Sequence, residues 1–437
     1  MLELPHVVIV GGGFGGLSAA RCLKNAPVRI TLIDRRNFHL FQPLLYQVAT
    51  GWLSPANIAS PLRIALRHQK NAHVMLGEAV DVDVETNQVV LSDGRIDYDV
   101  LVLATGSSHH YFGNERWRAF APGLKTVEDA TEIRRRIFLA FEAAERELDP
   151  ASVEGLLTFA IVGGGPTGVE LAGALGEIAH DTLVHDFRNI DPRRTTIHLF
   201  EGGERILPTY AAELSKKAAI NLARLGVTVH EHSVVSEITP EVLTIKHGEA
   251  VEHLACRTVI WAAGVEASPL GPALARHGAK IDRAGRVLVG PDLTVPGHPE
   301  IFVIGDLANS SHETGKPLPG VAPVAIQEGR YVAQTIEARL KNQTSEPFHY
   351  SDRGSMAIVG RGAAVAEIGR LHFSGYLAWL AWLFVHIVEL VEFENKILVL
   401  IQWGWYYFSR NRAARLITNT AATGQSDSEV NRQRQAV

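Results

Sequence analysis

The chain has few cysteines, no marked excess of one charge and no apolar leader, and each shortage excludes a class of protein. Its 437 residues include only two cysteines, Cys22 and Cys256, and neither belongs to a C-x-x-C or similar pair. A disulfide framework and a dithiol redox centre are therefore excluded. The net charge of −5 gives no general basic surface, so nucleic acid is not an expected partner. The start of the chain has no basic flank and no apolar h-region, which predicts that the protein is not secreted.

What the chain does contain is the same glycine-rich turn twice. VVIVGGGFGG starts at Val7 and FAIVGGGPTG starts at Phe159, and each copy follows an apolar strand and opens a helix. This order is typical of a dinucleotide-binding unit. The first glycine permits a tight turn, the second lets the backbone approach a pyrophosphate, and the third allows the helix to pack closely on the strand. These glycines are Gly11, Gly13 and Gly16 in the first copy and Gly163, Gly165 and Gly168 in the second.

An acidic residue follows each copy at the end of the next predicted strand. Asp34 ends RITLID, near the spacing at which a carboxylate holds both hydroxyls of an adenosine ribose. Glu201 follows TIHLF but lies farther from its glycines, which we attribute to an insertion, roughly GEIAHDTLVHDFRNIDPRR. An acid here repels a 2′-phosphate, so the second unit is expected to prefer NADH to NADPH. Arg205, which is nearby in the sequence, opposes this preference.

Three further strand ends complete the pattern. DYDVLVLATGSS contains Ala104, Thr105 and Gly106, and CRTVIWAAGVEAS contains its counterpart, Ala262, Ala263 and Gly264. We interpret these as paired crossings between two domains. PEIFVIGDLAN places Asp306 after an apolar strand, where a carboxylate could meet a ribityl chain and a pyrophosphate. The order of these motifs resembles the two-dinucleotide-binding flavoprotein superfamily over about residues 5–340, which implies FAD in the first unit and NAD(P)H in the second.

Three stretches are more specific and are similar to the type II NADH:quinone oxidoreductases, the single-subunit kind that does not pump protons. They are NFHLFQPLLYQVATG from Asn37, GGGPTGVELAGALGE with its insertion, and PGVAPVAIQEGRYVA from Pro319. The resemblance implies an α/β fold with two Rossmann-like domains, one inserted in the other. It also implies a respiratory-chain enzyme in which NADH gives hydride to FAD and the flavin gives two electrons to a membrane quinone.

The resemblance also implies roles for single residues. Glu170 resembles the acid beside the nicotinamide and the flavin, although a glutamate near a helix N-terminus is also favoured by the helix dipole alone. Gln327 matches the second glutamine of the family's A-Q-x-x-x-Q element beside flavin and quinone, whereas Pro323 replaces the first. Gln42 and Pro43 look like part of the wall over the isoalloxazine, or like an ordinary polar loop.

Two sets of binding residues follow from the resemblance. The expected FAD site contains Gly11, Gly13, Phe14, Gly15, Gly16, Asp34, Arg35, Gln42, Val80, Ala104, Thr105, Gly106, Asp306 and Ala325. The expected NADH site contains Gly163, Gly165, Pro166, Thr167, Gly168, Glu170, Glu201, Ala263 and Gly264. No metal site is expected.

The C-terminal part is the most apolar. Residues 376–393, about 27 Å long as a helix, could almost span a bilayer. His386, Glu389 and Glu392 interrupt the segment on one arc, and a charge at the bilayer centre costs roughly 2.5–3.5 kcal/mol. We therefore expect a helix that lies in the membrane interface. The opposite, apolar arc would hold Leu377, Trp379, Leu380, Leu383, Phe384, Ile387, Leu390 and Val391.

A second segment, from Ile397, is too short to span and ends in aromatic residues followed by arginines, which suits a membrane surface. Its aromatic residues are Trp403, Trp405, Tyr406 and Tyr407. An alternative, compatible with the first, is that both helices cover the core or form a homodimer interface.

These expectations divide the chain into four regions. They are an FAD-binding domain (1–115 and 286–345), an NAD(H)-binding domain with a linking helix (116–285), a membrane-anchoring or dimerisation portion (346–417) and a disordered tail (418–437). The protein is expected at the cytoplasmic face of the cell membrane, as a monotopic protein.

Two other functions remain open from the sequence. An NADH-dependent ferredoxin- or rubredoxin-type reductase shares both cradles but needs no apolar C-terminal helices. A membrane-associated flavoprotein could instead act as a redox sensor. A sulfide:quinone reductase needs redox cysteines, which this chain lacks.

Overall fold

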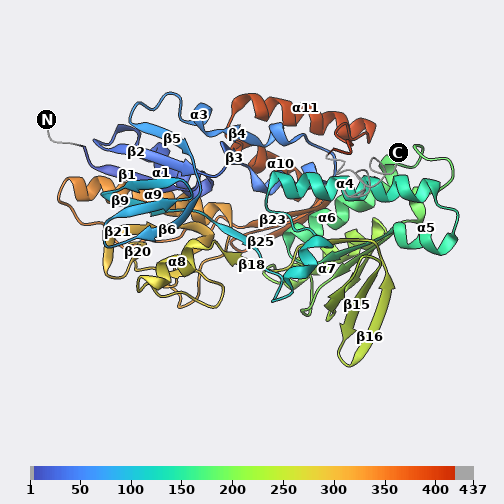
Figure 1. Ribbon diagram of the computed structural model, residues 1–437. Coiled ribbons are helices and arrows are strands. Elements are labelled where there is room, and N and C mark those ends of the chain that lie inside the picture. Colours follow the sequence, from blue (N-terminus) through green and yellow to red (C-terminus); the bar gives the residue numbers. More distant parts are fainter. Residues whose placement is uncertain (1–3, 419–437) are drawn as a thin grey trace, which may run out of the picture.

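The computed structural model describes residues 4–418 and contains two large sheets, each flanked by helices (Figure 1). The first sheet has six strands in the order β20, β21, β9, β1, β2 and β5. These are Thr294–Val295, His298–Val303, Val100–Leu103, His6–Val10, Arg29–Asp34 and Ala72–Leu76. All neighbours pair in parallel except β20 with β21. All five residues of β1 are buried, which suits a strand covered on both faces of a parallel sheet.

The second sheet repeats the centre of the first. Its four parallel strands are β13, β12, β11 and β17, at Val227–His230, Thr196–Phe200, Thr158–Val162 and Thr258–Trp261. In both sheets the strand before the glycine turn is central. On one side it pairs with the strand that leads to the acid, and on the other with the strand that leads to the domain crossing. Thus the repeated sequence motif corresponds to a repeated strand order.

The two crossings lie side by side. β10 (Ser107–His109) pairs antiparallel with β18 (Val265–Ala267), so the exits from the two sheets form a short ribbon of their own. The ATG and AAG segments are therefore paired in the structure, and their role as crossings between two domains stays a prediction.

Helices cover the sheets at close range where glycine allows it. The helix α1 (Phe14–Cys22) packs against α9 (Ala322–Leu340), and a Cβ at Gly329 would lie 2.3 Å from the carbonyl oxygen of Gly15. The helix α6 (Pro166–Glu177) follows the second glycine turn. The other helices of the two halves are α2 (Leu45–Ala49), α3 (Leu62–Ala65), α4 (Val127–Arg146), α5 (Pro150–Leu156), α7 (Ala212–Arg224) and α8 (Leu270–Arg276).

Small antiparallel sheets decorate both halves. β3 (Phe38–Leu40) pairs with β4 (Ala59–Pro61) beside the first glycine turn. Two three-stranded sheets are β6–β8 (Ala79–Asp83, Gln88–Leu91, Gly94–Asp97) and β14–β16 (Val234–Ile238, Val242–His247, Ala250–Ala255). A parallel pair joins β19 (Val287–Leu288) to β22 (Ala308–Asn309).

The C-terminal portion begins with a sheet that the sequence did not lead us to expect. Strands β23 (Ser355–Gly360), β24 (Ala363–Ile368) and β25 (Leu371–Gly375) precede the helices α10 (Tyr376–Glu389) and α11 (Phe393–Ser409). β23 packs on α6, and α10 packs on β24. In Figure 1 the two red helices lie on the side of the molecule opposite β15 and β16. Within residues 4–418, no helix has the length and apolar character that crossing a membrane requires.

The predicted division of residues 376–393 into one polar and one apolar arc is wrong, because Trp379 and Leu390 are buried whereas Leu377 and Phe384 are exposed. A break at residues 390–392 separates α10 from α11, and His386 is turned into the protein. Its ring stacks on Trp382 with 4.0 Å between the centroids, and its Nδ1–H donates to the Trp382 carbonyl oxygen at 2.7 Å. The inward side of α10 is apolar because it covers β24, which a single-helix arc plot does not reveal.

The aromatic residues of α11 are likewise divided between two faces. Trp403 and Tyr406 are buried, whereas Trp405 is 67% exposed. The exposed apolar side chains of both helices are Tyr376, Leu377, Leu380, Phe384, Val385, Val388, Phe393, Ile397, Leu398, Leu400, Ile401, Trp405 and Phe408. Of the predicted disordered tail, residues 419–437 lie outside the described residues.

Candidate active site

The first glycine turn has the geometry of an anion cradle. Gly11 has φ of +107°, and a Cβ there would lie 2.3 Å from the Ala104 carbonyl oxygen. A Cβ at Gly16 would lie 1.9 Å from the Gly11 carbonyl oxygen, so neither position tolerates a side chain. Gly13, directly before α1, faces open space, with no atom within 4 Å of a built Cβ. The helix N-terminus therefore opens onto a free volume that suits a pyrophosphate.

The second turn repeats this geometry. Gly163 has φ of +110°, and a Cβ there would clash with Ala262. A Cβ at Gly168 would lie 1.9 Å from the Gly163 carbonyl oxygen, whereas a Cβ at Gly165 would face open space. Pro166 and Thr167 then start α6, where proline is favoured because the first helical N–H has no partner within the helix.

The two acids lie where the sequence predicted them, at the strand end beside each turn. Asp34 accepts hydrogen bonds from the backbone N–H of Gly12 at 2.6 Å and of Arg36 at 2.7 Å. Glu201 accepts from the backbone N–H of Gly164 and of Gly203, both at 2.7 Å. Each carboxylate is therefore oriented by two fixed donors and keeps lone pairs for a ribose.

Arg205 forms hydrogen bonds with the turn that follows it. Its Nη2 donates to the carbonyl oxygens of Pro208 at 3.1 Å and Tyr210 at 3.4 Å. The guanidinium thus holds the following turn, and the preference for NADH stays a prediction.

A buried histidine that the sequence analysis did not single out lies against the first cradle. His39 is 2% exposed, and its Nδ1–H donates to the Gly12 carbonyl oxygen at 3.0 Å. Its ring is nearly perpendicular to that of Phe14, with 4.9 Å between the centroids. Burial lowers the pKa of His39 to about 4, so the ring is neutral and Nε2 is an acceptor. Among the described residues this atom has no partner, which fits a site completed by a bound group.

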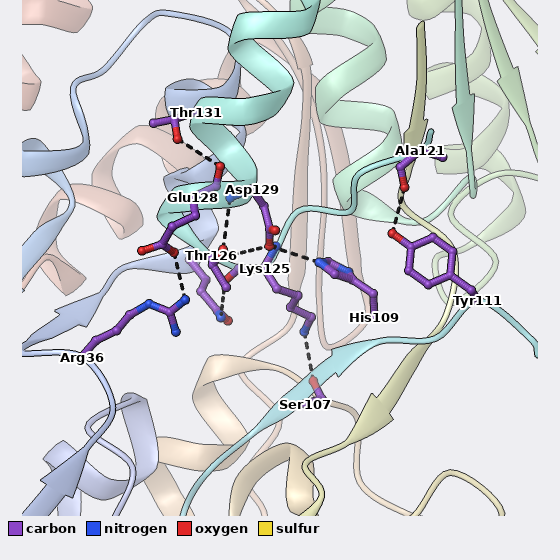
Figure 2. A network of polar contacts seen from close by, with 11 residues as sticks. Arg36, Ser107, His109, Tyr111, Ala121, Lys125, Thr126, Glu128, Asp129 and Thr131 are labelled. Carbon is purple, nitrogen blue, oxygen red and sulfur yellow. Dashed lines mark hydrogen bonds and ion pairs between the residues drawn. The ribbon is translucent and has the colours of Figure 1, made fainter. Parts of the chain in front are cut away.

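Asp306 belongs to a polar cluster at the crossing from the first sheet. Ser107 Oγ donates to Asp306 Oδ2 at 2.6 Å. Lys125 Nζ donates to Ser107 Oγ at 3.1 Å (Figure 2). The same nitrogen lies 3.5 Å from Asp306 Oδ2. Lys125 was missed because it is far from Asp306 in the chain and belongs to no motif.

Glu328 forms a hydrogen bond with the turn that contains Asp306. It is 1% exposed, and it accepts the Gly305 N–H at 2.6 Å. Burial, with a smaller contribution from the charge of Asp306, raises the pKa of Glu328 to about 8. Ala325, one turn earlier on α9, would contact a Cβ at Gly305 at 3.4 Å. The start of α9 therefore packs directly beneath Asp306.

The N-terminus of α4 joins the loops of the first site (Figure 2). Thr126 and Asp129 form a capping box, and Asp129 also lies 3.2 Å from His109 Nε2. Arg36 pairs with Glu128 at 2.9 Å, and Gln42 Nε2 donates to the Lys125 carbonyl oxygen at 3.2 Å. The linking helix thereby fixes the chain after Asp34.

Glu170 lies on α6, one turn beyond the second cradle. Burial raises its pKa to about 8, opposed by a hydrogen bond with the backbone of Ile358. Burial is also the main cause that raises the pKa values of Tyr46 and Tyr210. Tyr46 lies on α2, which packs on α6. A carboxyl group in this environment is largely neutral at pH 7 and can donate a proton.

Gln327 is occupied by the protein itself. Its Nε2 donates to the Ser351 carbonyl oxygen at 2.9 Å, and its Oε1 accepts the Ser351 N–H at 3.0 Å. The amide thus anchors the segment before the C-terminal sheet, and its contact with a quinone stays a prediction.

The remaining predicted residues lie in the two crossings or at exposed positions of the first half. Thr105 Oγ1 donates to Ser268 Oγ at 2.7 Å, and Gly106 and Gly264 both have positive φ. Ala263 follows β17, Arg35 is exposed after Asp34, and Val80 is 48% exposed on β6. Their contacts with a nucleotide stay predictions.

The two cysteines do not form a redox pair. Cys22 ends α1 and is exposed, whereas Cys256 is buried next to β17, and both are free thiols. Electrons cannot leave through an internal dithiol.

Comparison with known proteins agrees with this geometry. Residues 5–329 match the pyridine nucleotide-disulphide oxidoreductase family. Two type II NADH:quinone oxidoreductases of Mycobacterium tuberculosis, NdhA and Ndh, are 46% and 44% identical to the chain. Each match covers 95% of this chain, with 89% of NdhA and 91% of Ndh. The structure of NDH2 from Plasmodium falciparum in complex with NADH has the same fold, with a TM-score of 0.88 at 20% identity over 95% of this chain and 100% of that one. The duplicated cradles, the absent dithiol and these relatives agree, and the chain belongs to the type II NADH:quinone oxidoreductase family.

Proposed function

We propose that this protein oxidises NADH and reduces a membrane quinone without pumping protons, with FAD as its resident cofactor, in a respiratory chain. The observation that carries the proposal is the duplicated cradle in a chain of this family that has no redox cysteine pair. One cradle suits a resident flavin nucleotide and the other an exchanging NADH. The missing dithiol favours an acceptor that comes from outside the protein.

The first half would hold FAD by its pyrophosphate and adenosine ribose. The α1 N-terminus and Gly13 would face the phosphates, Asp34 would accept from the ribose, and Asp306 would contact the ribityl chain. FAD, when bound, supplies the two-electron chemistry that joins a hydride donor to a quinone. The protein contributes binding, orientation and exclusion of water. The remaining members of the proposed site are Gly11, Phe14, Gly15, Gly16, Arg35, Gln42, Val80, Ala104, Thr105, Gly106 and Ala325.

The second half would bind NADH through α6 and Glu201, whose charge opposes a 2′-phosphate. Glu170 is the proposed catalytic acid at the junction of the two halves. Its raised pKa keeps a proton on the carboxyl group near pH 7, and a quinone needs protons when it is reduced. Gln327 is the proposed quinone-side partner, after release of Ser351 or through the geometry that Ser351 maintains.

The C-terminal helices are the proposed membrane-binding surface. Their exposed apolar side chains include Leu377, Phe384 and Phe408, and an unpaired apolar face of this size suits a lipid interface. NADH is a cytoplasmic metabolite, so we assign this surface to the cytoplasmic face of the membrane. The same face could also join two copies of the chain as a homodimer.

The domain division follows the sheets. We assign residues 1–115 and 286–345 to FAD, 116–285 to NADH and 346–417 to the membrane portion. The support is that the six-stranded sheet takes strands from both FAD segments, 1–115 and 286–345. The four-stranded sheet lies wholly within residues 116–285.

An anaerobic titration tests the proposed function. NADH is added to the detergent-purified yellow protein, and a short-chain quinone follows once the flavin absorbance has bleached. Bleaching and rapid recovery are expected. If ferredoxin or rubredoxin restores the flavin absorbance and no quinone does, the protein is instead a ferredoxin- or rubredoxin-type reductase.

A further inference from the structure

The chain after α11 returns to the protein core as a short arm, residues 410–418. Ala414 N–H donates to the Gly51 carbonyl oxygen at 3.1 Å, and Arg412 Nη1 donates to the Thr50 carbonyl oxygen at the same distance. Thr50 and Gly51 directly follow α2, and the loop before α2 is the predicted wall over the flavin ring. The arm is therefore hydrogen-bonded to the first half of the molecule.

Arg412 is the buried centre of this arm. The residue is 1% exposed, and its Nη2 donates to Glu177 Oε2 at 2.9 Å. Its guanidinium carbon lies 4.8 Å from the ring centre of Trp52 and 5.3 Å from that of Tyr406. The charge is thus paired, hydrogen-bonded and enclosed by aromatic faces.

Glu177 connects the arm to the second half of the molecule. It is the last residue of α6, and it also accepts from the Tyr406 hydroxyl at 2.7 Å and from the Arg361 N–H at 2.6 Å. The Tyr406 hydroxyl comes from α11, and Arg361 follows β23. One carboxylate therefore joins α6, α11, the C-terminal sheet and the arm.

Glu170 lies two turns before Glu177 on the same side of α6, since seven residues make nearly two turns. A second polar chain leads from α11 toward it. Trp403 Nε1 donates to Gln47 Oε1 at 2.7 Å, and Gln47 Nε2 donates to the Tyr46 hydroxyl at 2.9 Å. Tyr46 lies on α2, which packs on α6. Both chains thus connect α11 to α6, the helix that carries Glu170.

Stability alone does not account for such a pair. Replacing a buried ion pair by apolar residues of similar volume is often neutral or stabilising, whereas a well-defined geometry is a recognised use of buried polar groups. The contacts join the elements that border the flavin, the nicotinamide and the membrane. We therefore expect the Arg412–Glu177 pair to determine how these elements are placed relative to one another.

We propose that Arg412 is a positioning residue for quinone reduction: through Glu177 it holds α11, α6 and the loop after α2 as one unit and so fixes the position of Glu170 relative to the exposed apolar face of α10 and α11. Electron entry from NADH depends on the cradles at the N-terminal ends of α1 and α6, whereas Glu177 lies at the opposite, C-terminal end of α6. The inference rests on the proposed NADH:quinone activity.

The test separates the two half-reactions in the FAD-loaded protein. The variants are Arg412→Met, Arg412→Lys and the double variant Arg412→Met with Glu177→Gln, which leaves no unpaired buried charge. Bleaching of the flavin by NADH is followed by stopped flow, and turnover is measured with a short-chain quinone so that membrane attachment does not limit it. We expect quinone turnover to fall about tenfold or more, because a 1 Å misplacement can cost on the order of 100-fold. Bleaching is expected to stay within about twofold of the wild-type rate, because positioning acts on the second half-reaction alone.

The matched control is Arg410→Met. Arg410 belongs to the same arm, but its ion pair with Asp181 is open to solvent, with side chains 55% and 33% exposed, so both half-reactions should stay normal. Equal loss of bleaching and turnover in the double variant, or normal turnover in it, would overturn the inference and leave the pair a structural contact. A wild-type protein that bleaches with NADH but reduces no quinone would overturn the proposed function as well.

Discussion

Asp34 and Glu201 occupy equivalent positions in the two halves of the molecule. Each carboxylate accepts the backbone N–H of the middle glycine of its GGG turn, Gly12 at 2.6 Å and Gly164 at 2.7 Å. The second oxygen of each accepts the N–H two residues farther along, from Arg36 and Gly203, at 2.7 Å in both. The two acids are thus held by the same pair of backbone donors, although one is an aspartate and the other a glutamate.

This equivalence predicts separate losses of the two nucleotides. Asp34→Ala should yield protein with less bound FAD, measured from the ratio of flavin to protein absorbance. Glu201→Ala should keep its FAD but raise the KM for NADH about 10- to 100-fold, since a hydrogen bond to a charged group is worth about 1.5–3 kcal/mol. It should also discriminate less against NADPH. Loss of FAD from the Glu201 variant would contradict the assignment of the two sites.

Gly173 should tolerate no side chain, because a Cβ there would lie 1.7 Å from the Val359 carbonyl oxygen and would force α6 away from β23. We expect Gly173→Ala to lower the free energy of unfolding by about 3 kcal/mol or more, as overpacked backbone contacts do. Thermal or denaturant unfolding measures this. Gly155→Ala on α5 is the control, because a Cβ there meets no atom within 4 Å and the change should be neutral or stabilising. Equal stability of the two variants would show that α6 is not tightly held.

The raised pKa of Glu170 makes stability depend on pH. Its ordinary value is 4.5, and burial raises it to about 8, so the folded protein binds more protons than the unfolded chain between these values. The stability contributed by this group is therefore lost as the pH rises from about 5 to about 8. Glu170→Gln should have a Tm similar to the wild type near pH 5 and a higher one near pH 8. A difference that does not change with pH would mean that the carboxyl group is not desolvated.

The exposed face of α10 should govern attachment to lipid. The double variant Leu377→Glu with Phe384→Glu places two charges on side chains that are 72% and 71% exposed, so the fold should survive while the affinity for the interface falls. Co-sedimentation with phospholipid vesicles should be lost, and NADH:ferricyanide activity in solution should be kept. Leu148→Glu, at a residue 94% exposed after α4, is the matched control and should leave vesicle binding unchanged. Retained vesicle binding in the double variant would assign this face to another role.

Much of the architecture could be predicted from the sequence because its evidence is local. The glycine spacing, the apolar strand before each turn and the acid at the next strand end are short-range patterns, and the backbone geometry at Gly11 and Gly163 matches them. The C-terminal helices were predicted as apolar segments, but their inward and outward faces were not, because the covering sheet β23–β25 had not been anticipated.

The sequence by itself determined the two cradles, their order and the family, because steric and hydrogen-bonding requirements of a nucleotide turn are met within a few dozen residues. Only the tertiary structure decided which distant groups meet there. Lys125 reaches Asp306, Arg205 turns to its own loop, and Arg412 pairs with Glu177 across 235 positions of the chain. The physical reason is that a buried charge is stable only beside a partner. Which partner it finds depends on how sheets and helices pack, and no local pattern records that.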